Sequence, residues 1–221
     1  MILQALTRYY DILANDDSID IARLGYSAVP VSFAANLSRE GELLDLIPQF
    51  DLVQRGKITK EIPRTMLLPE RVKRAVNIAP NYLWDNPVYV LGFSRDAKSS
   101  PTYAKERFEA FRQLHQKRLA TIDSPAAQAV VAFLNAHTPE TNEENPQIAR
   151  FLPELAKGGN LVFQVEGEWV HLDDAIRRAW EQQTGDDDAE SMQCLITGEV
   201  GPIKRLHPSL KGVREARAGG A

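Results

Sequence analysis

Four prolines shape the stretch between residues 56 and 92: Pro63, Pro69, Pro80 and Pro87. Proline lacks the backbone N–H that a helix needs, and it pushes the preceding residue towards extended conformations. This part of the chain is therefore expected to be extended and locally rigid, and not a long helix. The apolar run at residues 89–93 closes it and is expected to be a strand.

Hydrophobic periodicity places strands towards both ends of the chain and helices between them. Strand-like alternation occurs at residues 27–37, 43–53, 161–165, 169–172, 191–196 and 202–206. Pro30 marks its strand as an edge strand or as the site of a bulge. Helical spacing of apolar residues occurs at 2–14, 102–122, 125–134, 148–157 and 173–183. The predicted fold class is α+β, with short antiparallel strand pairs near both ends and a central helical layer.

Length and composition limit the kinds of protein that this chain can be. Its 221 residues can bury one good core. The single cysteine, Cys194, excludes an internal disulfide framework, and the strand pattern around it predicts a small buried side chain. No apolar run approaches the roughly 20 residues of a membrane helix, and the N-terminus is typical of an amphipathic helix. No membrane partner and a cytoplasmic location are expected.

Common catalytic motifs are missing from the sequence. It has no phosphate-binding loop, no nucleophile elbow and no metal-binding histidine pair, and its four histidines lack ligand spacing. His115 lies on an apolar helix face, where a hydrogen-bonded core histidine is expected. The acidic run at residues 186–188 leaves open a divalent-metal site, and with it a metal-dependent nuclease. Otherwise we expect neither an enzyme nor a bound cofactor.

Two short windows concentrate twelve of the 26 lysines and arginines. Because the whole chain has a net charge of −4, this pattern favours local basic patches over a surface that coats nucleic acid. A solvated basic loop without a ligand remains the alternative for the first window. The first window holds Arg55, Lys57, Lys60, Arg64, Arg71, Lys73 and Arg74, and the second holds Lys204, Arg205, Lys211, Arg214 and Arg217.

The first window leads into a segment rich in amides and aromatic rings. Asn77, Asn81 and Asn86 carry side chains of the kind that read base edges, while Tyr82 and Trp84 can stack on bases or wedge between them. For the two aromatic residues, a place in the core is the alternative.

Several phrases, taken in order, carry a family resemblance. They are ILQALxxYY (2–10), LPERxKR (68–74), APNYLWDN (79–86) with YVLG (89–92), GGNLVF (158–163), and CLITGE (194–199) with PIxRLHPxLKGV (202–213). In this order they resemble the large subunit of type I-C CRISPR Cascade, the RNA-guided surveillance complex of bacteria. The resemblance extends over the whole chain. It departs at residues 211–221, which read KGVREARAGGA where the family usually continues KGVRGAQSSGA, so Glu215 and Arg217 add charge.

The resemblance implies that residues 1–221 are the N-terminal domain of a longer large subunit and form a single compact domain. It implies a non-catalytic function: recognition of the protospacer-adjacent motif (PAM) on double-stranded DNA, and help in opening the duplex. Cations would hold the phosphate backbone, and Asn160 beside its two glycines joins the candidates for base reading. The residues expected to contact DNA are Lys57, Lys60, Arg64, Lys73, Arg74, Asn77, Asn81, Trp84, Asn86, Asn160, Lys204, Arg205, Lys211 and Arg214.

The implied partners are the target DNA, the guide-RNA ribonucleoprotein with the other Cascade subunits, and the helicase-nuclease recruited after target binding. The charge pattern also leaves room for a protein inhibitor that mimics DNA at the same basic site. A second hypothesis stays open, in which the chain is a scaffold whose basic windows meet guide RNA or neighbouring subunits without reading target DNA.

Overall fold

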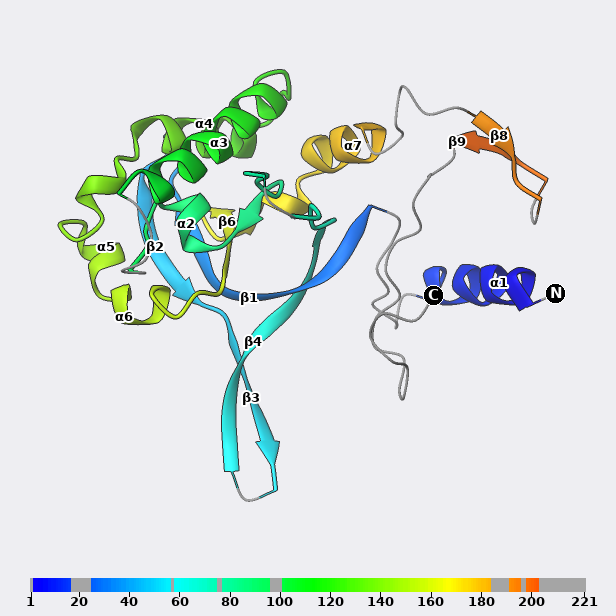
Figure 1. The fold of residues 1–221 in the computed structure, drawn as a ribbon, viewed down its shortest axis with the longest axis horizontal. Coiled ribbons are helices and arrows are strands. Elements are labelled where there is room, and N and C mark those ends of the chain that lie inside the picture. The colour runs from blue at the N-terminus through cyan, green and yellow to red at the C-terminus, as the bar shows by residue number, and fades with distance from the viewer. Residues whose placement is uncertain are drawn as a thin grey trace.

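A mixed seven-stranded sheet joins strands from both halves of the sequence (Figure 1). The computed structural model describes residues 2–16, 25–56, 58–74, 77–95, 101–183, 191–195 and 198–202. The elements in chain order are α1 (Ile2–Ala14), β1 (Tyr26–Leu37), β2 (Leu43–Pro48), β3 (Phe50–Arg55), β4 (Ile58–Pro69), β5 (Trp84–Asp85), α2 (Pro87–Val90), α3 (Pro101–Leu119), α4 (Pro125–Ala136), η1 (Pro139–Thr141), α5 (Pro146–Ala149), α6 (Leu152–Leu155), β6 (Asn160–Val165), β7 (Glu168–Trp169), η2 (Val170–Leu172), α7 (Asp174–Gln183), β8 (Ser191–Gln193) and β9 (Val200–Pro202).

β1 is the central strand of the large sheet. Its first half pairs antiparallel with β4, from Tyr26 opposite Pro69 to Val31 opposite Arg64. Its second half pairs antiparallel with β2 and, on the other side, parallel with β6. The predicted α+β class is confirmed, and β8 and β9 form a separate antiparallel pair. Local patterns do not predict the parallel β1–β6 pairing, because it joins strands from the two halves of the sequence in one sheet.

Helices α2 to α6 gather on one side of this sheet, where large side chains from both layers meet (Figure 1). The ring of Phe163 on β6 lies 6.2 Å from Phe111 of α3 and 6.0 Å from Phe133 of α4, measured between centroids. A smaller buried cluster, which includes Val31, Val162 and Trp84, lies apart from this main core. The loop that follows β4 is therefore anchored next to well-packed side chains.

Residues 89–93 do not form the predicted strand, because Pro87–Val90 form the short helix α2. The side chain of Asn86 accepts hydrogen bonds from the backbone N–H groups of Val88 and Tyr89, and Pro87 starts the helix. A capping asparagine followed by proline is a strong helix start signal. It overrides the strand propensity of this valine- and tyrosine-rich run.

The predicted strand at residues 43–53 is two strands, β2 and β3, which are separated at Gln49. The Gln49 N–H donates to the Ser32 carbonyl, and the Gln49 carbonyl accepts from the Arg64 N–H. Through this break the chain changes its partner from β1 to β4. β4 itself is the extended segment that the prolines predict.

Other residues act as local start and turn signals in the structure. Ser124 caps α4, and the carboxylate of Asp173 accepts from the N–H groups at the start of α7. Pro30 does not mark an edge strand, because β1 is central in the sheet. It lies in the part of β1 that pairs with β4, just before the β1–β6 register shifts between Val31 and Phe33, which is the kind of irregularity that the alternative predicts. Gly41 has a φ of 87° in the turn after β1, and a Cβ there would lie 2.6 Å from the backbone nitrogen of Phe133.

Three further expectations need correction, and the strand expected at 202–206 is tested only at Pro202. The helix predicted at 148–157 is two short helices, α5 and α6, and the strand predicted at 169–172 ends at Trp169 and continues as η2. β9 ends at Pro202, and residues 203–206 lie outside the described part of the chain. Cys194 is exposed and not buried, because it lies in the turn between β8 and β9, where its N–H donates to the Glu199 carbonyl. Among the described helices, none is long and apolar enough to cross a membrane.

Candidate nucleic-acid interface

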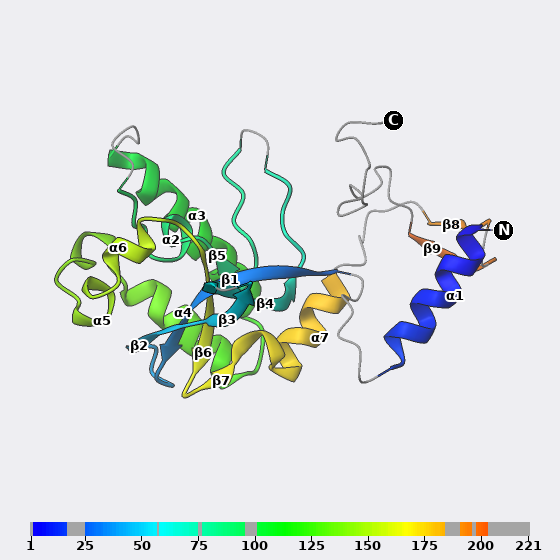
Figure 2. The ribbon, with the colours of Figure 1, turned by 90° about the horizontal axis from the view of Figure 1, so that it is seen from below.

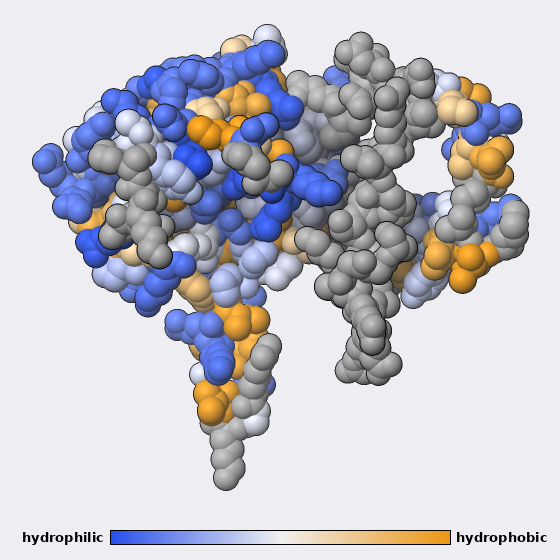
Figure 3. Space-filling model, viewed as in Figure 1, coloured by the Kyte–Doolittle hydropathy of each residue, from blue (hydrophilic) through white to orange (hydrophobic). Residues whose placement is uncertain are grey.

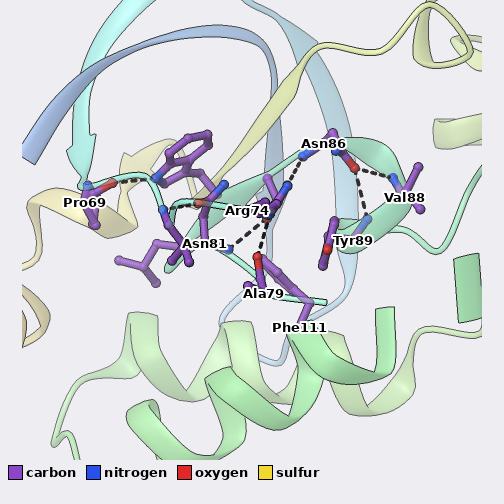
Figure 4. A network of polar contacts seen from close by, with 12 residues as sticks. Pro69, Arg74, Ala79, Asn81, Asn86, Val88, Tyr89 and Phe111 are labelled. Atoms are coloured by element: carbon purple, nitrogen blue, oxygen red, sulfur yellow. Dashed lines mark hydrogen bonds and ion pairs between the residues drawn. The ribbon is translucent and has the colours of Figure 1, made fainter. Parts of the chain in front are cut away.

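The loop between β4 and β5 projects from the sheet and carries the densest group of predicted contact residues (Figure 2). We call residues 70–83 the β4–β5 loop; residues 75 and 76 within it lie outside the described part of the chain. A network of polar contacts ties its two limbs together (Figure 4). The loop is long, so this network decides which of its side chains face inwards and which are left to meet a ligand.

The carboxylate of Asp85 is the centre of the network. Its Oδ2 accepts from the Asn81 N–H at 2.9 Å and forms an ion pair with the Arg74 guanidinium. Its Oδ1 accepts from the Asn86 N–H at 2.8 Å. Burial raises the pKa of the Asp85 carboxyl above its usual value, although Arg74 and the two N–H groups act in the opposite direction. A carboxyl placed this deeply needs the Arg74 charge beside it.

Arg74 spans the loop and is held on three sides. Besides the Asp85 pair, its Nε donates to the Ala79 carbonyl at 2.6 Å, and its guanidinium carbon lies 4.2 Å from the ring centre of Tyr89 (Figure 4). Its side chain is 28% exposed, against 1% for Asp85. The guanidinium therefore fixes the loop in the free chain, and only part of it faces solvent.

Asn81 and Trp84 are also turned inwards. Asn81 is 2% exposed, and its Oδ1 accepts from the Val72 N–H at 2.9 Å, which joins the two limbs of the loop. Trp84 is fully buried, and its Nε1 donates to the Pro69 carbonyl at 2.9 Å. Of the two alternatives for Trp84, the structure places it in the core. Tyr82, at 3% exposure, is likewise buried.

The end of the loop rests on a buried histidine. Leu83 has a φ of 66°, which is unusual for a leucine. Its N–H donates to Nε2 of His115 at 2.8 Å, and Nδ1 of His115 lies 2.7 Å from the Phe111 carbonyl. This geometry requires a neutral ring with its proton on Nδ1. Burial lowers the pKa of His115 to about 4, in agreement with that state and with the core histidine that the sequence predicts.

The Tyr82 ring completes this support. It is stacked between His115, at a centroid distance of 5.6 Å, and Trp180 of α7, at 5.1 Å. Burial raises the pKa of its phenol, so the hydroxyl stays protonated. The C-terminal limb of the β4–β5 loop is thus packed against two helices.

Three polar side chains remain on the outside of the β4–β5 loop: Arg71, Lys73 and Asn77 are all exposed. The Arg71 guanidinium lies 5.4 Å from the Trp84 ring centre, which gives it a cation–π contact from the outer side. Val72 and Ile78 are each 39% exposed beside them. Two cations, one amide and two aliphatic side chains on a braced loop can contact phosphates, a base edge and a base step.

The other predicted contacts lie elsewhere. Lys60 and Arg64 are exposed on β4, where Arg64 pairs with Asp51 at 3.2 Å. The Asn160 side chain donates to the Pro30 carbonyl at 2.7 Å, and Asn86 caps α2. The sequence-predicted contacts that lie outside the described residues are Lys57, Lys204, Arg205, Lys211 and Arg214.

Sequence reasoning missed Asp85, although a signal for it exists. A lone carboxylate in the apolar segment that runs from Tyr82 to Leu91 is costly to bury unless it has a partner. Lys73 and Arg74 are the closest cations before it in the sequence. The choice between them depends on the loop conformation, which the sequence alone does not give.

Metal ligands are a separate question. In the described part of the chain, no three His, Cys, Asp or Glu side chains are arranged to hold a metal ion. The acidic run at residues 186–188 lies outside the described residues.

Fold and loop together define a class: an α+β protein with one mixed sheet that presents a basic, internally braced loop. Residues 6–221 match the family model described as CRISPR-associated protein (Cas_Csd1), so the chain belongs to this CRISPR-associated family. No curated protein matches the chain. The resemblance seen in the sequence is thereby confirmed at the level of a CRISPR-associated family.

Proposed function

We propose that this chain is the N-terminal domain of the large subunit of a type I-C Cascade, and that it recognises the PAM on double-stranded DNA and helps to open the duplex without catalysing a reaction. Its membership of a CRISPR-associated family supports a place among the components of a CRISPR complex. The β4–β5 loop supports the more specific part of the proposal.

One observation carries the proposal: the Asp85 network holds the loop so that Arg71, Lys73 and Asn77 face outwards. A loop that is ordered before binding loses less conformational entropy when it meets its ligand. Lys73 and Arg71 would contact phosphates and fix the position of the duplex, and Asn77 would read a base edge. Such a division suits a protein that reads only a short duplex tag while guide RNA reads the remaining sequence.

Duplex opening needs a side chain that can enter a base step. Tyr82 and Trp84 are buried in the free chain, whereas Val72 and Ile78 reach the surface beside the cations. Aliphatic side chains serve as wedges in proteins that kink or unstack DNA. Val72 and Ile78 are therefore the candidates for this step. Recruitment of a helicase-nuclease would follow in the assembled complex, and a DNA-mimicking inhibitor would compete for the same loop.

A second function is a scaffold that contacts guide RNA or neighbouring Cascade subunits without reading target DNA. One observation favours it: Ile2, Leu6, Tyr9 and Ile12 of α1 are each more than half exposed. Apolar side chains gathered on one helix are typical of a surface that meets another protein.

The experiment that separates the two functions uses the assembled complex with Lys73→Ala or Arg71→Ala, and with Lys157→Ala as a control at another exposed lysine. Binding is measured on a PAM-bearing duplex and on the same duplex with a scrambled PAM, over a range of salt concentrations. Each loop variant should weaken binding and reduce the salt slope by about one. Loop variants that bind and discriminate as the unmodified complex does would contradict the proposal. Variants that fail to assemble, but discriminate the PAM in the complexes that form, would support the scaffold.

A further inference from the structure

The β3–β4 hairpin projects from the body of the protein as a two-stranded ribbon, residues 50–55 and 58–63 (Figure 1). Among the described strands, these two segments pair only with each other, from Phe50 opposite Pro63 to Arg55 opposite Ile58, and β4 pairs with β1 from Arg64 onwards. A Cβ on Gly56 would have no atom of the described chain within 4 Å. The six residue pairs make the ribbon about 20 Å long.

Both faces of the ribbon are open to solvent. Residues directly opposite each other in an antiparallel pair share a face, so Ile58 and Lys60 lie on one face, together with Val53. Leu52 and Glu61 lie on the other face. Ile58 is 61% exposed and Leu52 is 72% exposed. Hydrophilic and hydrophobic residues alternate along the projecting ribbon in Figure 3. Because an isolated two-stranded hairpin is only marginally stable in water, a ribbon this open is suited to a partner that covers it.

The charges indicate which partner this is. Residues 55–60 include Arg55, Lys57 and Lys60 and no acid. Lys60 is exposed and makes no ion pair within the described part of the chain, whereas Arg64, nearer to the body, is paired with Asp51. An outer end that is basic complements phosphates. The acidic Glu61 lies on the opposite face. Asp51, opposite Ile62, shares the face of Ile58 and Lys60, but Arg64 neutralises its charge, so Lys60 leaves this face cationic.

The width of a two-stranded ribbon and the aliphatic character of its exposed apolar side chains favour duplex DNA over RNA as the partner. The major groove of B-DNA is about 12 Å wide and admits a two-stranded ribbon, whereas that of an RNA helix is too narrow and deep. Single strands are bound mainly by stacking on aromatic rings. The exposed apolar side chains of the ribbon, Leu52 and Ile58, are aliphatic, and its one aromatic residue, Phe50, packs against Phe33 at 6.1 Å.

We infer that the β3–β4 ribbon lies in the major groove of the target duplex, with Lys60 at a phosphate and Ile58 against base edges. This inference rests on the proposed function and extends it, because the β4–β5 loop and the ribbon tip lie at opposite ends of β4. The 12 residues of β4 span up to about 40 Å at about 3.3 Å each. A turn of B-DNA is about 34 Å. The ribbon would therefore meet duplex about one turn from the PAM, on the flanking side where the two strands remain paired.

The test measures the affinity of the assembled complex for two PAM-bearing duplexes, one with a flanking arm of about 20 base pairs and one with about 5, which is half a turn. Lys60→Ala should weaken binding to the long duplex and reduce the salt slope by about one, while binding to the short duplex stays the same. Ile58→Ala should weaken binding to the long duplex about fivefold without changing the salt slope. Leu52→Ala and Glu61→Gln, on the opposite face, are the matched controls and should bind as the unmodified complex does.

Protection of guanine N7 from methylation gives an independent measure in the major groove. The unmodified complex should protect guanines in the flanking arm about one turn from the PAM, and the Lys60→Ala, Ile58→Ala double variant should lose this protection. If the Lys60→Ala and Ile58→Ala variants bind and protect DNA as the unmodified complex does, the inference is overturned. Variants that no longer assemble into the complex would also overturn it, because they would place the ribbon against a protein subunit or guide RNA. Lys73→Ala distinguishes a failure of the ribbon inference from a failure of the proposed function. If only Lys73→Ala weakens binding, the proposed function stands and the ribbon inference is wrong. If no variant weakens binding, the proposed function and the ribbon inference are both wrong.

Discussion

The Arg74 guanidinium and the Asp85 carboxylate form an ion pair between positions eleven residues apart, and this pair closes the β4–β5 loop. Arg74 is among the residues that the sequence marks as DNA contacts, yet in the free chain it braces the loop from inside. Its neighbour Lys73 has the same formal charge and is exposed. Arg74 is thus expected to stabilise the loop and Lys73 to contact DNA, and substitution of each residue can distinguish the two roles.

Replacing Arg74 with alanine should destabilise the fold by about 2–4 kcal/mol at neutral pH, because it leaves the Asp85 charge buried without its partner. Lys73→Ala should leave the free energy of unfolding nearly unchanged, since its side chain is exposed. Urea unfolding of both variants measures the difference. Equal stability of the two variants would show that Arg74 does not brace the loop.

The Arg74→Ala defect should also depend on pH. The pKa of Asp85 is already raised by burial, so the folded state holds a proton on this group more readily than the unfolded chain does. Loss of Arg74 raises that pKa further, and protonation then removes the unpaired charge. The stability difference between Arg74→Ala and the unmodified chain should therefore shrink as the pH falls from 7 towards 5 in the same unfolding experiment. A difference that grows on acidification would be incompatible with this origin.

Trp84→Ala should cost about 3–5 kcal/mol of stability, because it empties a fully buried site between β1, β4 and β6. Trp84→Phe should cost less, since it keeps most of the buried volume and loses the hydrogen bond to the Pro69 carbonyl. Thermal unfolding of the two variants gives the order. A stable Trp84→Ala chain that binds DNA poorly would place this side chain at the DNA instead of in the core.

Asn86→Ala should reduce stability by about 1 kcal/mol through loss of the α2 cap, and Asn86→Asp should retain most of it. Both variants should keep their affinity for duplex in folded complexes, because the Asn86 side chain is engaged by Val88 and Tyr89. Chemical unfolding and a DNA-binding titration on the same preparations test the two halves of this prediction. Selective loss of PAM discrimination in Asn86→Asp would contradict it.

His115 should make the protein less stable in acid. Its folded pKa, lowered by burial to about 4, lies below that of an unfolded histidine, so the unfolded chain binds the proton first as the pH falls below about 6.5. The contribution of His115 to the free energy of unfolding is constant above pH 6.5 and is lower by about 3 kcal/mol near pH 4. His171, with a pKa also lowered to about 4 by burial, acts in the same direction. The free energy of unfolding of His115→Gln should therefore fall less steeply between pH 6.5 and 4. An identical slope would show that His115 does not titrate in this way.

Periodicity and local start signals predicted most elements and the α+β class, because they report interactions within a few residues. Ser124 before Pro125 and Asp173 before α7 are such signals. The parallel pairing of β1 with β6 could not be predicted in this way, since it joins residues more than 120 apart in the sequence. At residues 87–90 the strand propensity of the side chains was the wrong guide, because one asparagine cap decided the outcome.

For the candidate site, the sequence located the segment but not the roles within it. Composition marks Arg74, Asn81 and Trp84 as readily as Lys73 and Asn77, since all five are of types that contact DNA. Only the fold separates them, through the buried carboxylate of Asp85 and the cluster of buried side chains that includes Trp84. The second basic window lies outside the described residues, and its part in DNA binding stays a prediction.

The most direct test of the central claim is crosslinking of the assembled complex to a duplex that carries photoreactive bases at the PAM, with the crosslinked residues of this chain mapped by mass spectrometry. We predict crosslinks within the β4–β5 loop, at or beside Arg71, Lys73 and Asn77, and their loss with a scrambled PAM. Crosslinks from the PAM to other subunits alone, with this chain linked only to guide RNA or to protein, would contradict the claim.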